Sequence, residues 1–245
     1  QKISVGPPFY HTLIIPFLIP FLLIMAIGPK LKWIKSNLED KIYLFTILVI
    51  SILLSITIVK NFSSNFLINT ILISSALYLF FITLRDFFSK GFKNLAQNTA
   101  HFGFSLLILS ILFNSLFSSE IITNLKVGQT FENSKAKIVF ESLSQKEGEN
   151  YKSIIGNFIV QDSNGKMENL SPELRIYNQP NITTSEADIK TTLLSDKFIV
   201  INLVQNQEFF NVRYQVKPFM LWIWISVILI SFGGLISFVK KEYEK

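Results

Sequence analysis

Five long apolar runs divide the chain. They cover residues 12–29, 42–59, 66–84, 98–117 and 219–239, and none of them contains an Asp, Glu, Lys or Arg residue. An α-helix needs about 20 apolar residues to cross a hydrocarbon core of roughly 30 Å. The pattern predicts an α-helical membrane protein with five transmembrane helices. Four of them lie in residues 1–117, and the fifth lies in residues 218–245 with a short tail.

Residues 118–217, between the fourth and fifth runs, follow a different pattern. Short β-branched and aromatic runs such as KFIVINLV and FNVRYQV alternate with turns, and the stretch DSNGK places Asn164-Gly165 between two such runs. An Asn-Gly pair in this setting predicts a β-hairpin. We expect about six or seven strands, which form a small all-β barrel or sandwich domain inserted between helices four and five.

Prolines and glycines refine the helices. Pro16 and Pro20 fall inside the first run, so we expect a kinked helix packed against protein, preceded by an ordered loop at SVGPPFY. Pro218 is expected in the first turn of the last helix, where its missing N–H costs nothing. In the same helix, Gly233-Gly234 permits close approach of a neighbour, and Trp222 and Trp224 fit an interfacial aromatic belt.

Composition supports the membrane assignment. The mean hydropathy is +0.41, and 16% of the residues are charged, against about 25% in soluble proteins. The net charge of +6 does not come from residues 118–217, which hold 11 basic and 12 acidic residues. It comes from short segments beside the apolar runs, which contain Lys30, Lys32, Lys35, Lys41, Arg85, Lys90, Lys93, Lys240, Lys241 and Lys245.

Short loops rich in Lys and Arg stay in the cytoplasm. Because those segments all fall on one side of a five-helix arrangement, we expect the C-terminus in the cytoplasm. Residues 118–217 are then extracytoplasmic, on the outer, periplasm-like side of the membrane. The basic residues thus reflect membrane topology, and nucleic-acid binding is not expected. The chain contains no cysteine, which excludes thiol chemistry and Cys-ligated metals from its own residues.

The fourth run carries one of the two histidines of the chain, about one turn inside its end. Asn98, His101 and Ser105 share one helix face by their spacing, and Gly103 leaves room beside them. A polar side chain inside a membrane helix is costly and indicates a functional site. The imidazole could ligate a metal such as porphyrin iron, or hydrogen-bond to a neighbouring helix, and the residues alone leave both alternatives open. His11 lies at the opposite boundary, where an interfacial histidine is ordinary.

The β segment offers little for catalysis. It contains no histidine. Glu186 and Asp188, two residues apart, could suggest a metal site, but no third ligand is near them in the sequence. We therefore expect a solvated strand edge or an ion pair at this position, and a docking role for the domain.

Several segments occur in a characteristic order: SVGPPFY, AHFGFSLLILSILF, LSPELRIY, TTSEADI, DKFIVINL and VRYQVKPFMLWIWISVILISFGGLISF. Together they resemble the C-terminal half of the CcmF/NrfE family of cytochrome c-type biogenesis proteins. In that family the histidine of the AHxG helix is an axial ligand of a membrane-embedded haem b. The resemblance therefore implies that His101 binds the haem iron. It implies no ligand role for His11 and indicates no catalytic residue.

The resemblance further implies a part in the System I cytochrome c haem lyase, in the bacterial inner membrane or, if organellar, the mitochondrial one. The enzyme joins haem vinyl groups to the CxxCH cysteines of apocytochrome c, so the thiols come from the substrate. The implied partners are the haem chaperone CcmE, CcmH, apocytochrome c, and the N-terminal portion of the same protein or a split partner. Quinol is the candidate electron donor.

The remaining functional histidines of the family and its tryptophan-rich external segment lie N-terminal to the matched region. We therefore expect the chain to be the last third of a longer protein or the C-terminal product of a split gene. By itself it is expected to be inactive in haem attachment. The alternative function is a haem-free membrane scaffold or permease subunit that docks partners through its β domain.

Overall fold

The computed structural model describes residues 7–30, 38–62, 65–89, 94–162, 165–204 and 208–243. The chain forms two compact units. The helical unit comprises Gln1–Leu116 and Trp222–Lys245, and the β unit comprises Phe117–Leu221.

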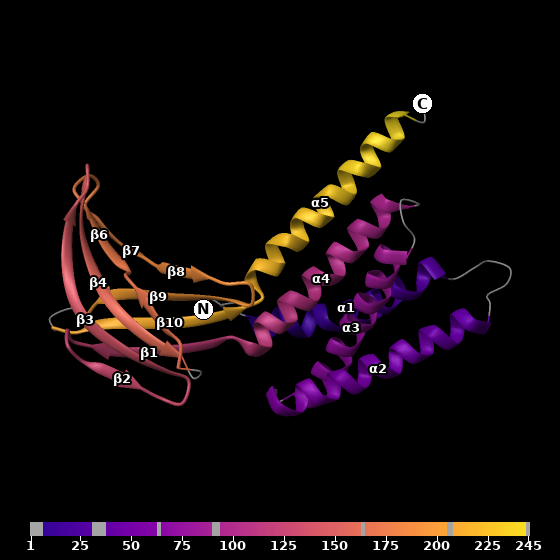
Figure 1. Ribbon diagram of the computed structural model, residues 1–245, viewed down its shortest axis with the longest axis horizontal. Coiled ribbons are helices and arrows are strands. Elements are labelled where there is room, and N and C mark those ends of the chain that lie inside the picture. The colour runs from indigo at the N-terminus through magenta and orange to yellow at the C-terminus, as the bar shows by residue number, and fades with distance from the viewer. Residues whose placement is uncertain are drawn as a thin grey trace, which may run out of the picture. The chain divides into compact units, whose positions relative to one another are not determined.

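The described residues form five long helices (Figure 1). They are α1 (Pro7–Ile27), α2 (Leu38–Phe62), α3 (Phe66–Ser89), α4 (Leu95–Phe117) and α5 (Met220–Tyr243), with a short 3-10 turn, η1 (Gly28–Lys30), after α1. Each of the five is long and apolar enough to cross a membrane. The five predicted transmembrane helices are therefore confirmed.

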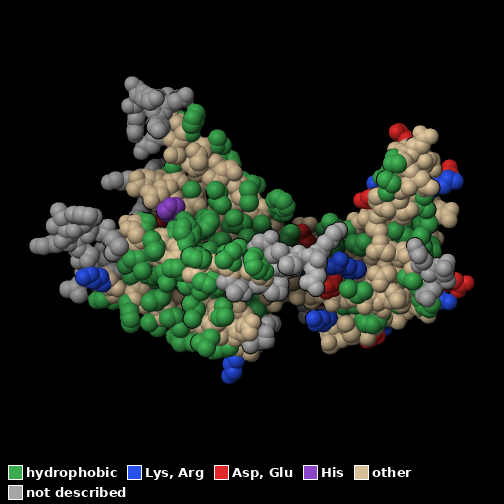
Figure 2. Space-filling view, turned by 180° about the vertical axis from the view of Figure 1, so that it is seen from behind, with side chains coloured by type: hydrophobic (Ala, Val, Ile, Leu, Met, Phe, Trp, Pro, Cys, Tyr) green, Lys and Arg blue, Asp and Glu red, His purple; other side chains and the backbone are tan. Residues whose placement is uncertain are grey.

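Helix α3 lies at the centre of the helical unit. In its apolar window 56% of the residues are buried, against 17% in α2 and 11% in both α1 and α5. The buried apolar cluster around α3 includes Leu22 of α1, Val59 of α2 and Leu109 of α4. By contrast, the other helices turn large apolar side chains outward, such as Phe17 on α1 and Phe238 on α5. Apolar side chains accordingly cover much of the helical unit in Figure 2, as lipid contact requires.

The start of α1 differs from the sequence-based expectation. The helix begins at Pro7, so the PPFY part of the expected loop is helical. Proline is suited to a first helical turn because the N–H that it lacks would have no partner there. Pro16 and Pro20 lie inside α1 as predicted.

The β unit lies between α4 and α5 in the chain, as predicted, and consists of two antiparallel sheets. Its strands are β1 (Ser119–Leu125), β2 (Thr130–Glu132), β3 (Ala136–Glu147), β4 (Tyr151–Asp162), β5 (Met167–Leu170), β6 (Glu173–Tyr177), β7 (Ile182–Glu186), β8 (Asp188–Thr191), β9 (Ser195–Leu203) and β10 (Phe210–Pro218). One sheet has the order β1-β10-β9-β8. The other has the order β2-β3-β4-β6-β7, and β5 also pairs with β4.

The two sheets enclose one apolar core. Phe140 of β3 stacks on Phe158 of β4, with ring centroids 4.3 Å apart. The same ring meets Phe210 of β10 edge-on at 5.5 Å and so joins the two sheets. The predicted hairpin at DSNGK joins β4 to β5, and Gly165 adopts the left-handed φ of 81° that its turn requires. The unit is therefore a sandwich.

Two expectations for this unit are corrected. The described residues contain ten strands, not six or seven, because several strands are only three to five residues long. Pro218 is the last residue of β10, so it does not lie in the first turn of α5, which begins at Met220. A strand end tolerates proline because no further ladder hydrogen bond is needed there. Between strand and helix, Phe219 takes a left-handed φ of 62°.

Candidate functional site

His101 lies in the second turn of α4 and is half-buried. It borders a cavity of about 390 Å³ between α4 and α5. Half of the lining consists of small residues, which include Ala96 and Ala100 from α4 and Gly233 and Gly234 from α5. Among the described residues, the imidazole is thus the one aromatic nitrogen ligand that borders this groove.

Glycines set the width of this groove. A Cβ atom on Gly233 would lie 2.7 Å from the backbone nitrogen of Ala100, so only glycine permits this close crossing of α4 and α5. One turn along α4, a Cβ on Gly103 would lie 2.9 Å from the backbone nitrogen of Ile230. Gly234 has open space where its Cβ would be. The predicted close approach at Gly233-Gly234 therefore comes from Gly233, while Gly234 borders the cavity.

A second, smaller cavity of about 150 Å³ also borders His101. Its lining is polar and includes Thr83 and Asp86 of α3 together with Gln97 and Asn98 of α4. His101 therefore separates a groove of small residues from a polar pocket. Among the residues that the structure describes, none is hydrogen-bonded to the imidazole.

The two polar residues that share the helix face of His101 contact α3. The Asn98 side-chain amide donates a hydrogen bond to the backbone oxygen of Asp86, at 3.1 Å. The Ser105 hydroxyl lies 2.7 Å from that of Thr83. Both pairs are partly or fully buried, where a hydrogen bond is most costly to break. They hold α4 at a fixed rotation against α3 and so fix the direction of His101.

An ion pair next to this site was not expected from the sequence. Lys30, at the end of η1, pairs with Asp86 of α3, and both side chains are largely buried. Lys30 was counted among the basic residues that mark the cytoplasmic side, but here its charge is matched by Asp86. The one indication of this ion pair in the sequence is that the acidic Asp86 directly follows the basic Arg85. The Arg85 guanidinium itself stacks over the Tyr43 ring, 3.8 Å from its centroid.

The second histidine contributes less to the description. His11 lies in α1, and its side chain is outside the described residues.

Glu186 and Asp188 contact different partners of the β unit. Glu186 accepts a hydrogen bond from the Thr184 hydroxyl at 3.0 Å, and Asp188 accepts one from the backbone N–H of Ser171 at 2.6 Å. Across the described part of the chain, no cluster of His, Cys, Asp and Glu has the composition of a metal site.

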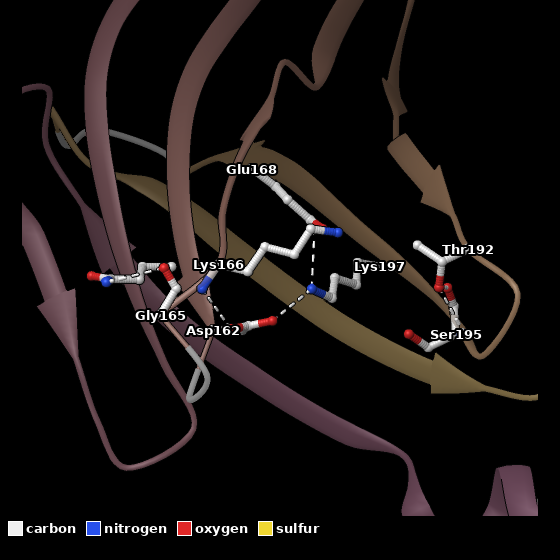
Figure 3. A network of polar contacts seen from close by, with 8 residues as sticks. Asp162, Gly165, Lys166, Glu168, Thr192, Ser195 and Lys197 are labelled. Atoms are coloured by element: carbon white, nitrogen blue, oxygen red, sulfur yellow. Dashed lines mark hydrogen bonds and ion pairs between the residues drawn. The ribbon is translucent and has the colours of Figure 1, made fainter.

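The β unit contains a charged network that joins its two sheets (Figure 3). Lys197 of β9 lies 3.0 Å from Asp162 of β4 and 3.3 Å from Glu168 of β5. Lys166 approaches Glu168 to 2.8 Å. Burial opposes the charge of Glu168, but hydrogen bonds from Lys166 and Lys197 outweigh it and hold the pKa of this carboxyl below its ordinary value. Through these ion pairs the network connects β9 of one sheet with β4 and β5 of the other.

Comparison with known proteins finds similarity to one group of cytochrome c-type biogenesis proteins. A family model described as the CcmF C-terminal beta-sandwich matches residues 116–218. The cytochrome c-type biogenesis protein CcmF of Pseudomonas fluorescens is 26% identical over 99% of this chain. CcmF of Escherichia coli is 26% identical over 100% of it, and NrfE of Haemophilus influenzae is 24% identical over 100%.

The fold agrees with these similarities. A solved structure of the cytochrome c haem lyase CcmF superimposes on 94% of this chain with a TM-score of 0.72 and 18% identity. The chain spans 40% of that structure and 39% of the Pseudomonas fluorescens and Escherichia coli relatives.

Proposed function

The chain corresponds to the C-terminal portion of the CcmF/NrfE family, and from this premise we propose that it forms part of a cytochrome c haem lyase. In this proposal, His101 supplies one axial ligand to a haem b held in the membrane. The N-terminal portion of the protein, or a split partner, supplies the other ligand and the surface that presents the substrate haem.

The position of His101 carries the proposal. Its imidazole is half-buried inside a membrane helix, borders two cavities and has no hydrogen-bond partner among the described residues. A polar group held in this way at a membrane helix points to a ligand. An imidazole without such a bond is available to ligate iron, which supports the ligand alternative over a hydrogen bond to a neighbouring helix.

The groove fits one half of a haem site. Its volume of about 390 Å³ lies within the range of roughly 300–1,000 Å³ that cofactor sites occupy. Small residues at 96, 100, 233 and 234 leave room for a flat apolar group beside the imidazole. Within the described helices, His101 is the one imidazole whose side chain is placed, so the described residues offer one imidazole ligand. A two-ligand site therefore needs the remainder of the protein.

The haem would supply electron transfer, with a potential set by its ligands and burial. The residues of this chain orient the ligand. Asn98 and Ser105 tie α4 to α3, and Gly103 and Gly233 keep α5 close. Quinol is the proposed electron donor. CcmE, CcmH and apocytochrome c are the proposed partners. The chain has no cysteine, so the thiols for thioether formation come from apocytochrome c.

A visible absorption spectrum of the purified complete protein tests the proposal against the haem-free scaffold or permease subunit. We expect b-type bands that sharpen on reduction, as two axial nitrogen ligands produce. A colourless preparation that is otherwise folded and membrane-inserted would favour the scaffold. The test needs the complete protein, because the proposed site takes its second ligand from outside this chain.

We propose the inner membrane as the location, with the β unit in the periplasm and the C-terminus in the cytoplasm. The positive-inside rule supports this orientation through the segments that precede α2, follow α3 and end the chain. The ion pair with Asp86 neutralises Lys30, so Lys30 no longer adds to the positive charge on the cytoplasmic side. The other basic residues in the short segments beside the spans still lie mainly on that side of the proposed membrane arrangement.

Reporter fusions test this orientation. Alkaline phosphatase fused at Gly165 of the β unit should be active, because the enzyme folds only outside the cytoplasm. The same reporter fused after Lys245 should be inactive. A fusion at Asn65, between α2 and α3, is the matched control and should also be active. Activity at Lys245 together with inactivity at Gly165 would reverse the topology.

A further inference from the structure

The turn between β8 and β9 carries two exposed leucines at its tip. Leu193 and Leu194 are 62% and 65% exposed. Thr192 and Ser195 close the turn: the Thr192 backbone N–H donates to the Ser195 oxygen at 3.0 Å, and the Thr192 hydroxyl donates to the same oxygen at 2.7 Å. A tight turn on a soluble surface normally carries Gly, Asn, Asp or Ser at its tip. Two leucines there indicate an apolar environment.

The register of the sheet places this turn beside the start of a membrane span. Strands β9 and β10 pair Ser195 with Pro218, which is the last residue of β10. The next residue, Phe219, donates its backbone N–H to the oxygen of Leu194 at 2.8 Å. Helix α5 then begins at Met220, and Met220–Val239 is a membrane-spanning segment. The tip of the turn is therefore bonded to the residue directly before the span.

The hydrogen bond also fixes an unusual backbone. Phe219 adopts a left-handed φ of 62°, which is unfavourable for a large L-residue. Because this residue turns the chain from β10 into α5, its bond to Leu194 keeps the leucine turn next to the first turn of the helix. Trp222 and Trp224 follow within that helix, and tryptophan is enriched where a span enters the lipid headgroups.

We propose that the β8–β9 turn inserts Leu193 and Leu194 into the lipid interface next to α5. The β unit is then held to the membrane at a third point, in addition to its connections to α4 and α5. Lipid is the occupant that the position favours, because the turn is continuous through a hydrogen bond with a segment that enters the bilayer. This inference does not depend on haem binding.

The test uses the absence of cysteine in the chain. A single cysteine introduced as Leu194→Cys is labelled with a nitroxide, and the full chain is reconstituted into phosphatidylcholine–phosphatidylglycerol vesicles. Collision rates of the nitroxide with oxygen, which concentrates in lipid, are compared with those of a water-soluble nickel chelate. Leu193→Cys provides a second reporter in the same turn.

Leu203→Cys is the matched control. Leu203 is 51% exposed and lies at the other end of β9, about 26 Å from Ser195 at roughly 3.3 Å per residue. We expect the ratio of oxygen to nickel collisions to be several-fold higher at positions 193 and 194 than at 203. Equal, water-like ratios at all three positions would overturn the proposal. Shielding of 193 and 194 from both reagents would overturn it as well, because it would show a protein contact in place of lipid.

Discussion

Replacing His101 by glycine in the complete protein is expected to abolish or strongly loosen binding of the proposed b-type haem. The other residues that line the groove offer backbone, amide and hydroxyl groups, none of which is a good axial ligand for iron. The glycine variant leaves the space of the imidazole open. Added free imidazole should therefore restore part of the haem signal. Haem content per protein, measured from the reduced absorption spectrum, gives the readout.

Two variants separate loss of a ligand from general damage. His11→Gly removes the other histidine and should leave the haem content unchanged. Ser105→Ala removes the bond to Thr83 but keeps the imidazole, so haem should be retained while stability falls by about 1 kcal/mol. Wild-type haem content in His101→Gly would end the ligand assignment. Loss of haem in His101→Gly without any recovery in imidazole, but with a lowered protein level, would point to folding.

Replacing Lys197 by methionine is expected to destabilise the β unit by about 3 kcal/mol, the lower end of the cost of breaking a buried ion pair. Methionine keeps the length of the side chain but removes the ammonium group that lies between Asp162 and Glu168. Both carboxylates would then lose the ammonium group that they share. Because the pair joins β9 to β4 and β5, the contact between the two sheets should weaken.

Hydrogen exchange of backbone amides in β4 and β9 measures this effect. A loss of about 3 kcal/mol corresponds to amide exchange roughly a hundredfold faster where exchange requires unfolding of the unit. Lys190→Met is the matched control, since Lys190 lies opposite Lys197 on β8 but is exposed. It should change stability by less than about 0.5 kcal/mol. Equal exchange in the two variants would show that the network contributes nothing.

The same network predicts a pH dependence. The pKa of Glu168 in the folded protein lies below its ordinary value of 4.5 because Lys166 and Lys197 favour the charged form. Its contribution to stability is complete above the ordinary value and is lost as the pH falls through the lowered one. The difference between wild type and Lys197→Met should therefore shrink in strong acid.

The helices could be predicted closely because each apolar run is long and free of charge. Their ends could not. Pro7 begins α1 since proline fits a first helical turn, whereas Pro218 ends β10 because the ladder with β9 extends up to it. Both positions tolerate proline because no backbone N–H has to donate a hydrogen bond there. Whether such a proline belongs to a helix or to a strand is decided by tertiary pairing, which the local sequence does not show.

The long strands of the sandwich were recognisable from their alternating residues, and the Asn-Gly turn marked a hairpin. Short strands such as β2, β5 and β8 could not be distinguished from loops in the sequence. Three or four residues are too few to show an alternation of apolar and polar side chains. The sandwich also depends on contacts such as Phe140 with Phe210, which are distant in the chain.

For the candidate site, the sequence indicated His101 and the polar face that it shares with Asn98 and Ser105. It did not indicate that Asn98 and Ser105 bond to α3, because helix packing decides their partners. The pairing of Lys30 with Asp86 joins residues 56 positions apart, and no spacing rule links them. From the sequence alone, a charged residue beside a span such as Lys30 is interpreted as a topology marker. Only the fold shows that Lys30 lies next to Asp86.

The strand order of the sandwich also bears on how the membrane region assembles. Strand β1 follows α4 and β10 precedes α5, yet these two strands are neighbours, with Ser119 paired to Val216. A flexible loop of the 100 residues from Ser119 to Pro218 would cost about 4 kcal/mol of closure entropy when its ends meet. Folding of the sandwich removes that cost in advance. Once the sandwich has folded, α4 and α5 are connected through two neighbouring strands, as if by a short turn. The folded sandwich thereby favours packing of α5 against α4, which forms the groove beside His101.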